Sequence, residues 1–182
     1  PSAGPSSALS SESLAALIRA RLDEMLIAGT TTVEAKSGYG LSLASEIGIL
    51  RALALAGARH PVEVIPTFLG AHVVPLEFRA AGGRSDYVRL LVEEMIPRIA
   101  REGLARFCDV FVDEGAFTLE EARQILTAAA RYGLGLRVHA EQLTHTGAAV
   151  LAASLGAFSA DHLERLSDED IVTLAAGWGP GS

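Results

Sequence analysis

Segments with strand character and segments with helix character alternate along the chain, and this alternation limits the fold more than any other feature. Short runs rich in β-branched residues predict strands at residues 30–40, 61–75, 107–115, 134–142 and 157–164. Apolar residues at helical spacing predict helices at residues 13–29, 42–57, 85–103, 118–133, 145–156 and 167–177. Strand–helix–strand units with short loops form parallel sheets with right-handed crossovers. We therefore expect an α/β protein built on a five-stranded parallel sheet.

Polar and apolar side chains alternate within the strands, which favours a barrel over an open sheet. Strands that helices cover on both faces are continuous apolar runs, whereas the order here is polar–apolar–polar, as in Arg137-Val138-His139. In a TIM barrel one strand face packs against helices, and the other opens onto a site at the carboxyl ends of the strands. The pattern therefore predicts barrel geometry, with functional groups at the ends of the strands.

The length of the chain predicts part of a barrel. A complete barrel of eight strands needs about 250 residues, and this chain has 182 residues and five predicted strands. We expect one domain over residues 1–182, with a loose lead-in over residues 1–9. The Pro/Ser-rich beginning and the WGPGS end favour a partial TIM barrel with about five of the eight strands.

Several helices carry their own start and stop signals. Ser10 or Ser11 can cap the first helix, and Thr118 with Glu121 forms a capping box before another. Pro97 should kink or break the helix over residues 85–103. The first helix places six apolar residues on one stripe: Leu14, Leu17, Ile18, Leu22, Met25 and Leu26.

Composition excludes several classes of partner. The net charge of −7 argues against nucleic acid and anionic membranes, which attract basic surfaces. No run of about 18 apolar residues predicts a membrane helix, and the N-terminus lacks the pattern of a signal peptide. The single cysteine, Cys108, reads as a small buried hydrophobe and fits a reducing compartment. We therefore expect a cytoplasmic protein that acts on a small molecule.

Histidines follow or end three of the predicted strands. His72, His139 and His162 would converge at the mouth of one barrel, where neutral imidazoles can bind a metal ion or exchange protons. His60 lies in a loop at the opposite end, and His145 starts a helix, so we interpret both as structural or facing solvent. The sequence contains no H-x-H or H-E-x-x-H motif, so spacing alone gives little support for a metal site.

The loop SGYG, residues 37–40, presents a tyrosine between two glycines after the first strand. Tyr39 is either an ordinary loop residue or a phenol offered to a ligand, with glycines that allow the backbone to approach. The loop lacks the spacing of a phosphate-binding loop. Lys36, directly before it, is the one lysine beside fourteen arginines.

Five stretches, in this order, resemble imidazolonepropionases of the amidohydrolase superfamily: TTTVEAKSGYGL, PTFLGAHVVP, FCDVFVDEGAF, LRVHAEQL and SADHLERLSDE. The resemblance extends from about Ser10 to Ile171. It implies a metal-dependent (β/α)8 barrel with a small β domain built from the two chain ends. It also implies hydrolysis of 4-imidazolone-5-propanoate to N-formimidoyl-L-glutamate in histidine degradation, with one Zn²⁺ or Fe³⁺ ion that activates water.

The resemblance gives roles to five residues of this chain. His139 matches a metal-ligand histidine, and His162 matches a histidine beside the scissile amide. Tyr39 and His72 match residues that contact the substrate. Gln142 stands where relatives have glutamate or glutamine; since an amide cannot act as a general base, we expect it only to hydrogen-bond the substrate. The resemblance assigns no role to the neighbouring carboxylate, Glu141.

The other metal ligands of the family, an H-x-H motif and a late aspartate, have no match in this sequence. The resemblance therefore predicts a central fragment that carries one of four ligands and is inactive alone. A homodimer is compatible with this prediction. Two alternatives stay open: another amidohydrolase, such as a deaminase or cyclic amidase, and a half-barrel that serves as a non-catalytic interaction module.

Overall fold

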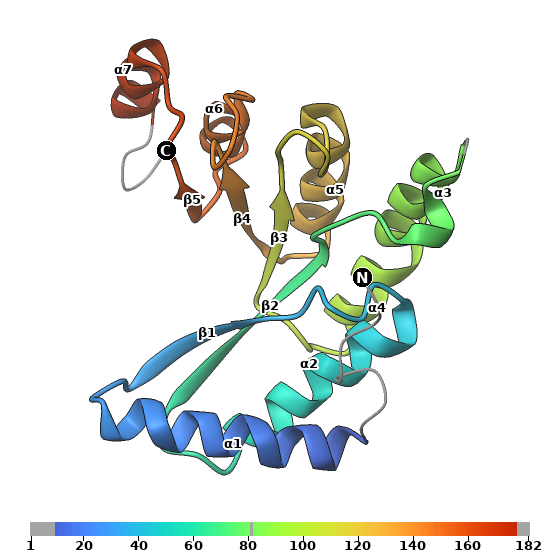
Figure 1. The fold of residues 1–182 in the computed structure, drawn as a ribbon, viewed down its shortest axis with the longest axis vertical. Helices are drawn as coiled ribbons and strands as arrows, with labels where there is room; N and C mark the ends of the chain where they lie inside the picture. The colour runs from blue at the N-terminus through green and yellow to red at the C-terminus, as the bar shows by residue number, and fades with distance from the viewer. Residues whose placement is uncertain (1–9, 81, 178–182) are drawn as a thin grey trace.

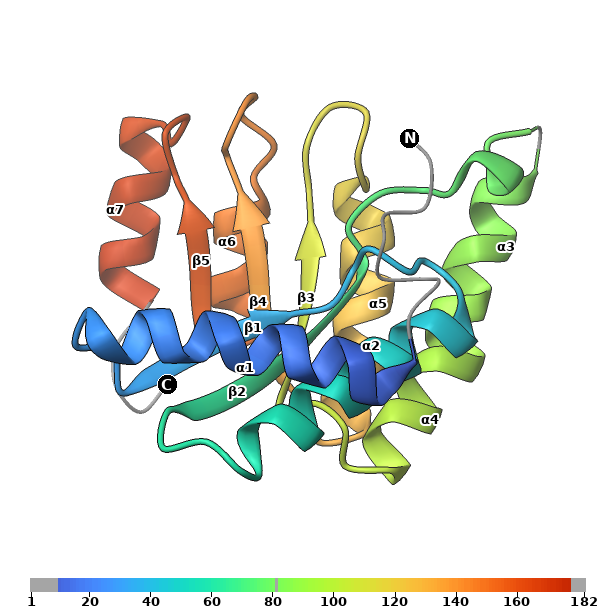
Figure 2. The same cartoon turned by 60° about the horizontal axis from the view of Figure 1, so that its bottom comes forward.

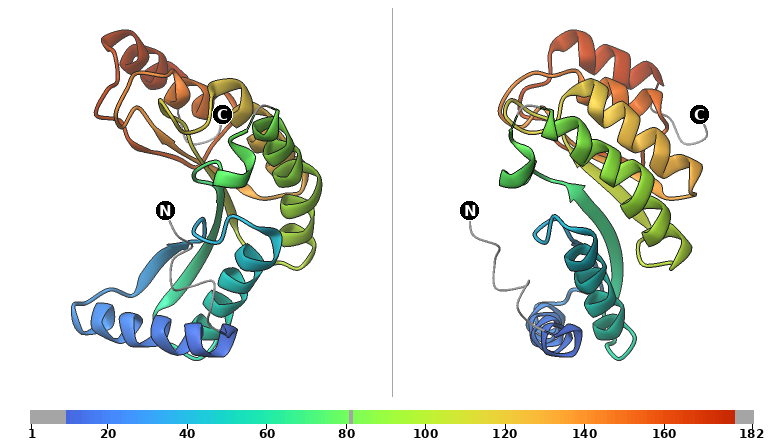
Figure 3. Two further views of the ribbon diagram at one scale, coloured as in Figure 1. Left: turned by 45° about the vertical axis from the view of Figure 1, so that its right-hand side comes forward. Right: turned by 90° about the vertical axis from the view of Figure 1, so that its right-hand side faces the viewer.

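The computed structural model describes residues 10–80 and 82–177, and its centre is a five-stranded sheet (Figure 1). The strands are β1 (Thr32–Lys36), β2 (Glu63–Ala71), β3 (Phe107–Phe111), β4 (Gly135–Ala140) and β5 (Ser159–His162). They pair in chain order, and every pair is parallel. The sheet curls, with helices on its convex side (Figure 3). The predicted partial TIM barrel of five strands is thereby confirmed.

Helices precede, connect and follow the strands. They are α1 (Ser11–Ile27), α2 (Leu43–Gly57), α3 (Gly83–Leu90), α4 (Ile96–Arg101), α5 (Leu119–Arg131), α6 (Ala148–Ser154) and α7 (Asp168–Gly177). Ser10, Ser42 and Thr118 accept hydrogen bonds from the first-turn amides of α1, α2 and α5, and Thr118 completes its capping box with Glu121. These side chains satisfy amides that have no partner within the helix. The predicted lead-in and the WGPGS end lie outside the described residues.

Pro97 interrupts the longest predicted helix, as expected. It lies in the first turn of α4, and the preceding segment η3 (Leu91–Met95) is a π-helix. Proline lacks an amide hydrogen and its ring clashes with the preceding turn, so the regular α-helical pattern cannot continue through it. A short 3-10 turn, η2 (Leu76–Phe78), precedes this helical stretch. β3 follows it.

The predicted apolar stripe of α1 is only partly correct. Leu22 is buried, but Leu17 is 57% exposed, and Met25 and Leu26 are exposed to a smaller extent. The helix packs mainly against α2, where Ala15 and Leu22 meet Ala52 and other residues of a small cluster. Contact with one neighbouring helix buries a narrow stripe, whereas the prediction assumed contact with a wide surface.

The main core fills the space between the convex face of the sheet and the helices. The apolar residues of the strand alternation, among them Cys108, Val110, Leu136 and Val138, are buried there with helix residues such as Leu126. Their polar neighbours in the sequence therefore face the concave side. No helix in the described ranges is long and apolar enough to cross a membrane.

Candidate functional site

The predicted site residues gather where the strands end, along the edge from which the loops of Figure 2 rise. The Tyr39 and His72 rings lie 5.6 Å apart between centroids, and those of His139 and His162 lie 5.3 Å apart. Phe111 joins the two pairs, with its ring 6.1 Å from His72 and 6.1 Å from His139. Five rings from different strand ends thus form one continuous row.

The loop that carries Tyr39 is fixed by a buried carboxylate. Glu46, in the first turn of α2, accepts hydrogen bonds from the backbone amides of Gly38, Gly40 and Leu41 at 2.8–2.9 Å. The carboxylate is fully buried, so these charge-assisted bonds anchor the loop firmly. Tyr39 itself is 63% exposed. Residues 37–41 therefore form a rigid support for an accessible phenol.

The glycines of this loop serve packing within the protein. Gly38 has φ +102°, and a Cβ there would lie 2.4 Å from the carbonyl oxygen of Leu69. A Cβ at Gly40 would lie 2.5 Å from that of Ser45. These glycines are therefore required by packing, since no larger residue fits against the neighbouring strand and helix. The approach of a ligand to this loop stays a prediction.

His72 follows β2 and is oriented by the same loop. Its Nδ1 lies 3.2 Å from the carbonyl oxygen of Gly38. A carbonyl can only accept, so Nδ1 carries the hydrogen and Nε2 has the free lone pair. The imidazole thus presents an acceptor atom beside Tyr39.

The loop after β4 is anchored by two further buried carboxylates. Glu141 accepts from the amides of Thr146, Ala148 and Ala149 at the start of α6. Asp113 accepts from the amide of Leu143 and the hydroxyl of Thr144 in the same loop. Both carboxylates are thereby committed to structure.

Gln142 lies between these anchors, partly exposed. In the described part of the chain its side chain makes no hydrogen bond, which leaves its amide available. Its proposed contact with substrate stays a prediction.

His162 ends β5 in an unusual backbone conformation. Its φ is +82°, and Leu163 and Glu141 also have positive φ. Such angles are rare for residues other than glycine and cost of order 1–3 kcal/mol each. The His162 Nδ1 lies 3.5 Å from a carboxylate oxygen of Glu164. Strained residues held in place by the fold are common at functional sites, and these three lie at the ends of adjacent strands.

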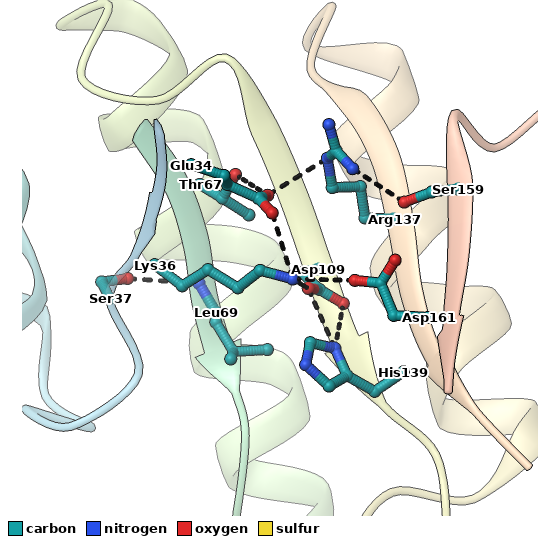
Figure 4. Close-up of polar contacts among 10 residues, drawn as sticks. All are labelled: Glu34, Lys36, Ser37, Thr67, Leu69, Asp109, Arg137, His139, Ser159 and Asp161. Carbon is teal, nitrogen blue, oxygen red and sulfur yellow. Dashed lines mark hydrogen bonds and ion pairs between the residues drawn. The ribbon is translucent and has the colours of Figure 1, made fainter. Parts of the chain in front are cut away.

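Below the row of rings, the concave face holds a cluster of charged side chains (Figure 4). The Lys36 ammonium lies 2.7 Å from Asp109 Oδ2 and 3.0 Å from Asp161 Oδ2. His139 Nδ1 lies 3.0 Å from each carboxylate oxygen of Asp109. Asp109 is completely buried. Four residues from four strands therefore form one cluster, in which Lys36 and His139 contact the buried carboxylate of Asp109 and Lys36 also contacts Asp161.

A second polar group lies beside this cluster, toward the start of the strands. Glu34 accepts from the hydroxyl of Thr67 at 2.5 Å and lies 3.1 Å from Arg137 Nε. Arg137 also donates through Nη1 to the hydroxyl of Ser159 at 2.8 Å. Glu34 reaches the first cluster as well, since its carboxylate lies 3.4 Å from the Lys36 ammonium. The concave face is thus a connected network of ion pairs.

The network shifts the pKa values of two of its members, Lys36 and Asp161. Burial alone would lower the pKa of the Lys36 ammonium, but the charges and hydrogen bonds of Asp109 and Asp161 outweigh burial and raise this pKa. Burial would likewise raise the pKa of the Asp161 carboxyl, but the hydrogen bond and charge of Lys36 lower it. Both shifts favour the charged forms.

One group of side chains has the spacing of metal ligands. Donor atoms of Asp109, His139 and Asp161 all lie within 4.8 Å of one another. His139 is the one predicted site residue in this group. The ring nitrogen Nε2 of His139 makes no hydrogen bond to any described residue, so it offers a free lone pair when Nδ1 carries the hydrogen.

The sequence prediction missed Asp109, Asp161 and Arg137 as members of the site, and it left the role of Lys36 open. The strand alternation placed Asp109 and Arg137 on the polar face, which was the available signal. The two remaining histidines lie away from the row: His60 Nε2 is 3.1 Å from Asp23, and His145 Nε2 is 2.5 Å from Asp170.

Comparisons with known proteins agree with the resemblance in the sequence. The chain is 54% identical to the imidazolonepropionase of Myxococcus xanthus over 168 residues, 92% of this chain and 39% of that protein. It is 54% identical to that of Symbiobacterium thermophilum, with the same coverage, and 48% identical to that of Haloarcula marismortui over 90% of this chain. No family model matches. The chain therefore spans about two fifths of the length of these curated relatives.

Proposed function

We propose that this chain is the central part of an imidazolonepropionase, an enzyme that opens the cyclic amide of 4-imidazolone-5-propanoate by hydrolysis. The observation that carries the proposal is the row of Tyr39, His72, His139 and His162 along one edge of a curled parallel sheet. Barrel enzymes keep their active sites at this edge. The sequence identity to imidazolonepropionases supports the assignment of substrate.

The reaction adds water to the ring carbonyl carbon and breaks the bond from this carbon to the ring nitrogen. The product is N-formimidoyl-L-glutamate, with the proton from water on the departing nitrogen. Such a reaction needs a group that accepts a proton during attack and returns it to nitrogen. His162 suits this role, because imidazole exchanges protons readily near neutral pH and its ring lies 5.3 Å from that of His139.

Tyr39, His72 and Gln142 are assigned to binding and orienting the substrate. The Tyr39 phenol is exposed on its anchored loop, and His72 presents an acceptor nitrogen beside it. Gln142 can donate and accept through its amide. A propionate carboxylate and a ring with N–H groups offer complementary partners. Rigid loops position these groups before substrate arrives, which reduces the cost of ordering them.

A metal ion fits the donor set through His139. With Nδ1 held by Asp109, the imidazole offers Nε2, and zinc and iron both accept imidazole ligands. When bound, such an ion supplies Lewis-acid activation of water for the attack. His139 is one donor, and a catalytic zinc site usually has three protein ligands. The remaining donors would come from parts of the enzyme that lie outside the segment represented by this chain.

Assay of the full-length protein with 4-imidazolone-5-propanoate tests the proposal. We expect His162→Asn to lower kcat/KM by about 10²–10⁴-fold, the usual contribution of a general acid–base group. His60→Asn, at the opposite end of the strands, should leave the rate within about twofold. Absence of hydrolysis by the unmodified protein would refute the function. Hydrolysis that His162→Asn leaves unchanged would refute the role of this residue.

The 182-residue chain, purified alone and loaded with zinc, should show no turnover. One imidazole does not fix the geometry of a metal ion or tune its water. The measurement is the loss of substrate absorbance against a metal-free blank. A clear rate that disappears in the His139→Ala variant would show that these residues suffice for activity, and would contradict this part of the proposal.

A further inference from the structure

Asp109 lies between the single lysine of the chain and the histidine assigned to the metal. Its carboxylate is completely buried. The Lys36 ammonium approaches Oδ2 at 2.7 Å, and His139 Nδ1 lies 3.0 Å from Oδ1. Figure 4 shows the lysine and the histidine reaching the carboxylate from strands on either side of β3. Nothing in the proposed reaction uses either Lys36 or Asp109 directly.

This arrangement determines which nitrogen of His139 carries the hydrogen. A carboxylate paired with an ammonium is an acceptor only. The hydrogen in the contact with Asp109 must therefore lie on His139 Nδ1, which leaves Nε2 with the lone pair. Metal-binding histidines commonly donate their other N–H to a carboxylate, which fixes the tautomer and the ring orientation.

An alternative is that Asp109, His139 and Asp161 together bind a cation. Their donor atoms are close enough, within 4.8 Å. However, the space between the two carboxylates already holds a cation, the Lys36 ammonium, at 2.7 Å from one and 3.0 Å from the other. A metal ion would have to displace this ammonium. The structure thus favours ion pairing inside the cluster and metal binding through the outward nitrogen, Nε2.

We propose that Lys36 and Asp109 are positioning residues for His139: the lysine fixes the carboxylate, and the carboxylate fixes the tautomer that offers Nε2 to a metal ion. The inference rests on the proposed role of His139 in the enzyme. It adds two residues for which the comparisons give no role, and it explains the place of the only lysine in the sequence.

The second polar group of the concave face supports this arrangement. Glu34 lies 3.4 Å from the Lys36 ammonium and is itself held by Thr67 and Arg137. Lys36 is therefore fixed by three carboxylates, and its flexible stem has little freedom. A positioning group needs such support, because a loosely held second residue does not preserve the geometry of the first.

The variant Asp109→Asn gives a specific test. The amide oxygen would turn toward Lys36, which can only donate, so the amide NH₂ would face His139. Nδ1 would then accept, and the hydrogen would move to Nε2, the atom needed for the metal. Asp109→Ala would leave both tautomers accessible. We therefore expect Asp109→Asn, although isosteric, to weaken metal binding more than Asp109→Ala. A loss of packing alone would give the opposite order.

Two measurements on the full-length protein test which nitrogen of His139 carries the hydrogen and how tightly the protein binds zinc. The ¹⁵N spectrum of the metal-free, histidine-labelled protein, assigned with a His139→Gln variant, should show Nδ1–H in the unmodified protein and Nε2–H in Asp109→Asn. Competition with a chelator for Zn²⁺ should show about 10–100-fold weaker binding by Asp109→Asn, as is usual when a partner of a ligand is lost. Asp23→Asn, which removes an exposed carboxylate paired with His60 and outside this network, should stay within about threefold.

The outcomes separate this inference from the proposed function. Nε2–H in the unmodified protein, or an Ala variant that binds zinc more weakly than a folded Asn variant, would overturn the positioning role. If the Ala variant does not fold, the spectrum of Asp109→Asn decides alone: an unchanged tautomer would overturn the proposal. If the full-length protein shows the predicted tautomers but has no hydrolase activity, the positioning role stands and only the proposed reaction is refuted.

Discussion

The convex and concave faces of the sheet come from alternate residues of the same strands, yet they are stabilised in opposite ways. The convex side of β4 buries Leu136 and Val138 against helices, and its contribution comes from apolar area removed from water. The concave side carries Arg137 and His139 in a network of ion pairs. Buried ion pairs are weak contributors to stability, but removing one partner is costly. The convex face therefore supplies most of the stability, and the concave face holds charges that cannot be removed singly without a large cost.

The largest effect on stability should come from Lys36→Met. The substitution keeps the length of the side chain but leaves Asp109 and Asp161 without their cation. Breaking a buried pair in this way costs about 3–5 kcal/mol. The deficit should shrink as the pH falls, because Lys36 lowers the pKa of the Asp161 carboxyl and this part of the stabilisation is lost when that carboxyl is protonated. Urea unfolding of the variant and the unmodified protein at several pH values measures this, and a deficit below about 1 kcal/mol at pH 7 would contradict it.

On the convex face, Leu126→Ala should destabilise the protein by about 3 kcal/mol, within the range for cavities in a packed core. Leu126 is fully buried on α5. This loss should not depend on pH, since no charge is exposed or removed. The exposed Leu17 of α1 provides the control, as Leu17→Ala should cost well under 1 kcal/mol. A pH-dependent loss for Leu126→Ala would show that the two faces are not energetically separate.

Replacing Asp113, in the loop after β3, should have a smaller effect on stability, and this effect should depend on pH. Burial would raise the pKa of its carboxyl, but hydrogen bonds from Thr144, Leu143 and Glu114 lower it. Because the folded-state pKa lies below the unfolded one, about 3.9, the stabilisation is fully present above that pH and disappears as the pH falls through the folded-state pKa.

Asp113→Asn should therefore cost about 1.5–3 kcal/mol at pH 7, the value of a hydrogen-bonded charge. The difference from the unmodified protein should decline below about pH 4. Denaturant unfolding at pH 7 and pH 3 checks this, with the adjacent exposed Glu114→Gln as control. A difference that grows on acidification would reverse the assigned sign of the pKa shift.

The smallest expected effect is at the start of α5. Thr118→Ala removes half of the capping box with Glu121 and should cost about 1 kcal/mol. Thr118→Ser keeps the hydroxyl and should cost much less. Thermal unfolding of both variants measures the difference. Equal losses would show that the methyl group of Thr118, and not the cap, provides the stabilisation.

The sequence predicted the parts of this molecule that depend on local pattern. The order of strands and helices, the cap at Thr118 and the break at Pro97 follow from spacing and from the chemistry of single residues. The grouping of His72, His139 and His162 could also be expected, since parallel strands end at a common edge. Leu17 was assigned wrongly because its exposure depends on how much of α1 other elements cover.

The charged cluster was harder to foresee for a physical reason. Asp109 and Asp161 are separated by 52 residues along the sequence, and they meet through the curl of the sheet and the reach of Lys36 across it. Alternation gives the face on which a side chain lies, but not its partner. Glu141 is a second case: it follows His139 by two positions, just after β4, but its backbone has a positive φ and its carboxylate accepts from an amide of α6.

Metal content of the full-length protein, measured by elemental analysis for His139→Ala beside the unmodified protein and His60→Ala, tests the central claim most directly. His139 stands on the concave side with Nδ1 held by Asp109, whereas His60 lies at the opposite end of the strands. We predict that His139→Ala loses most of its bound zinc or iron and that His60→Ala retains it. Unchanged metal content in a folded His139→Ala protein would contradict the assignment of this edge as the metal site.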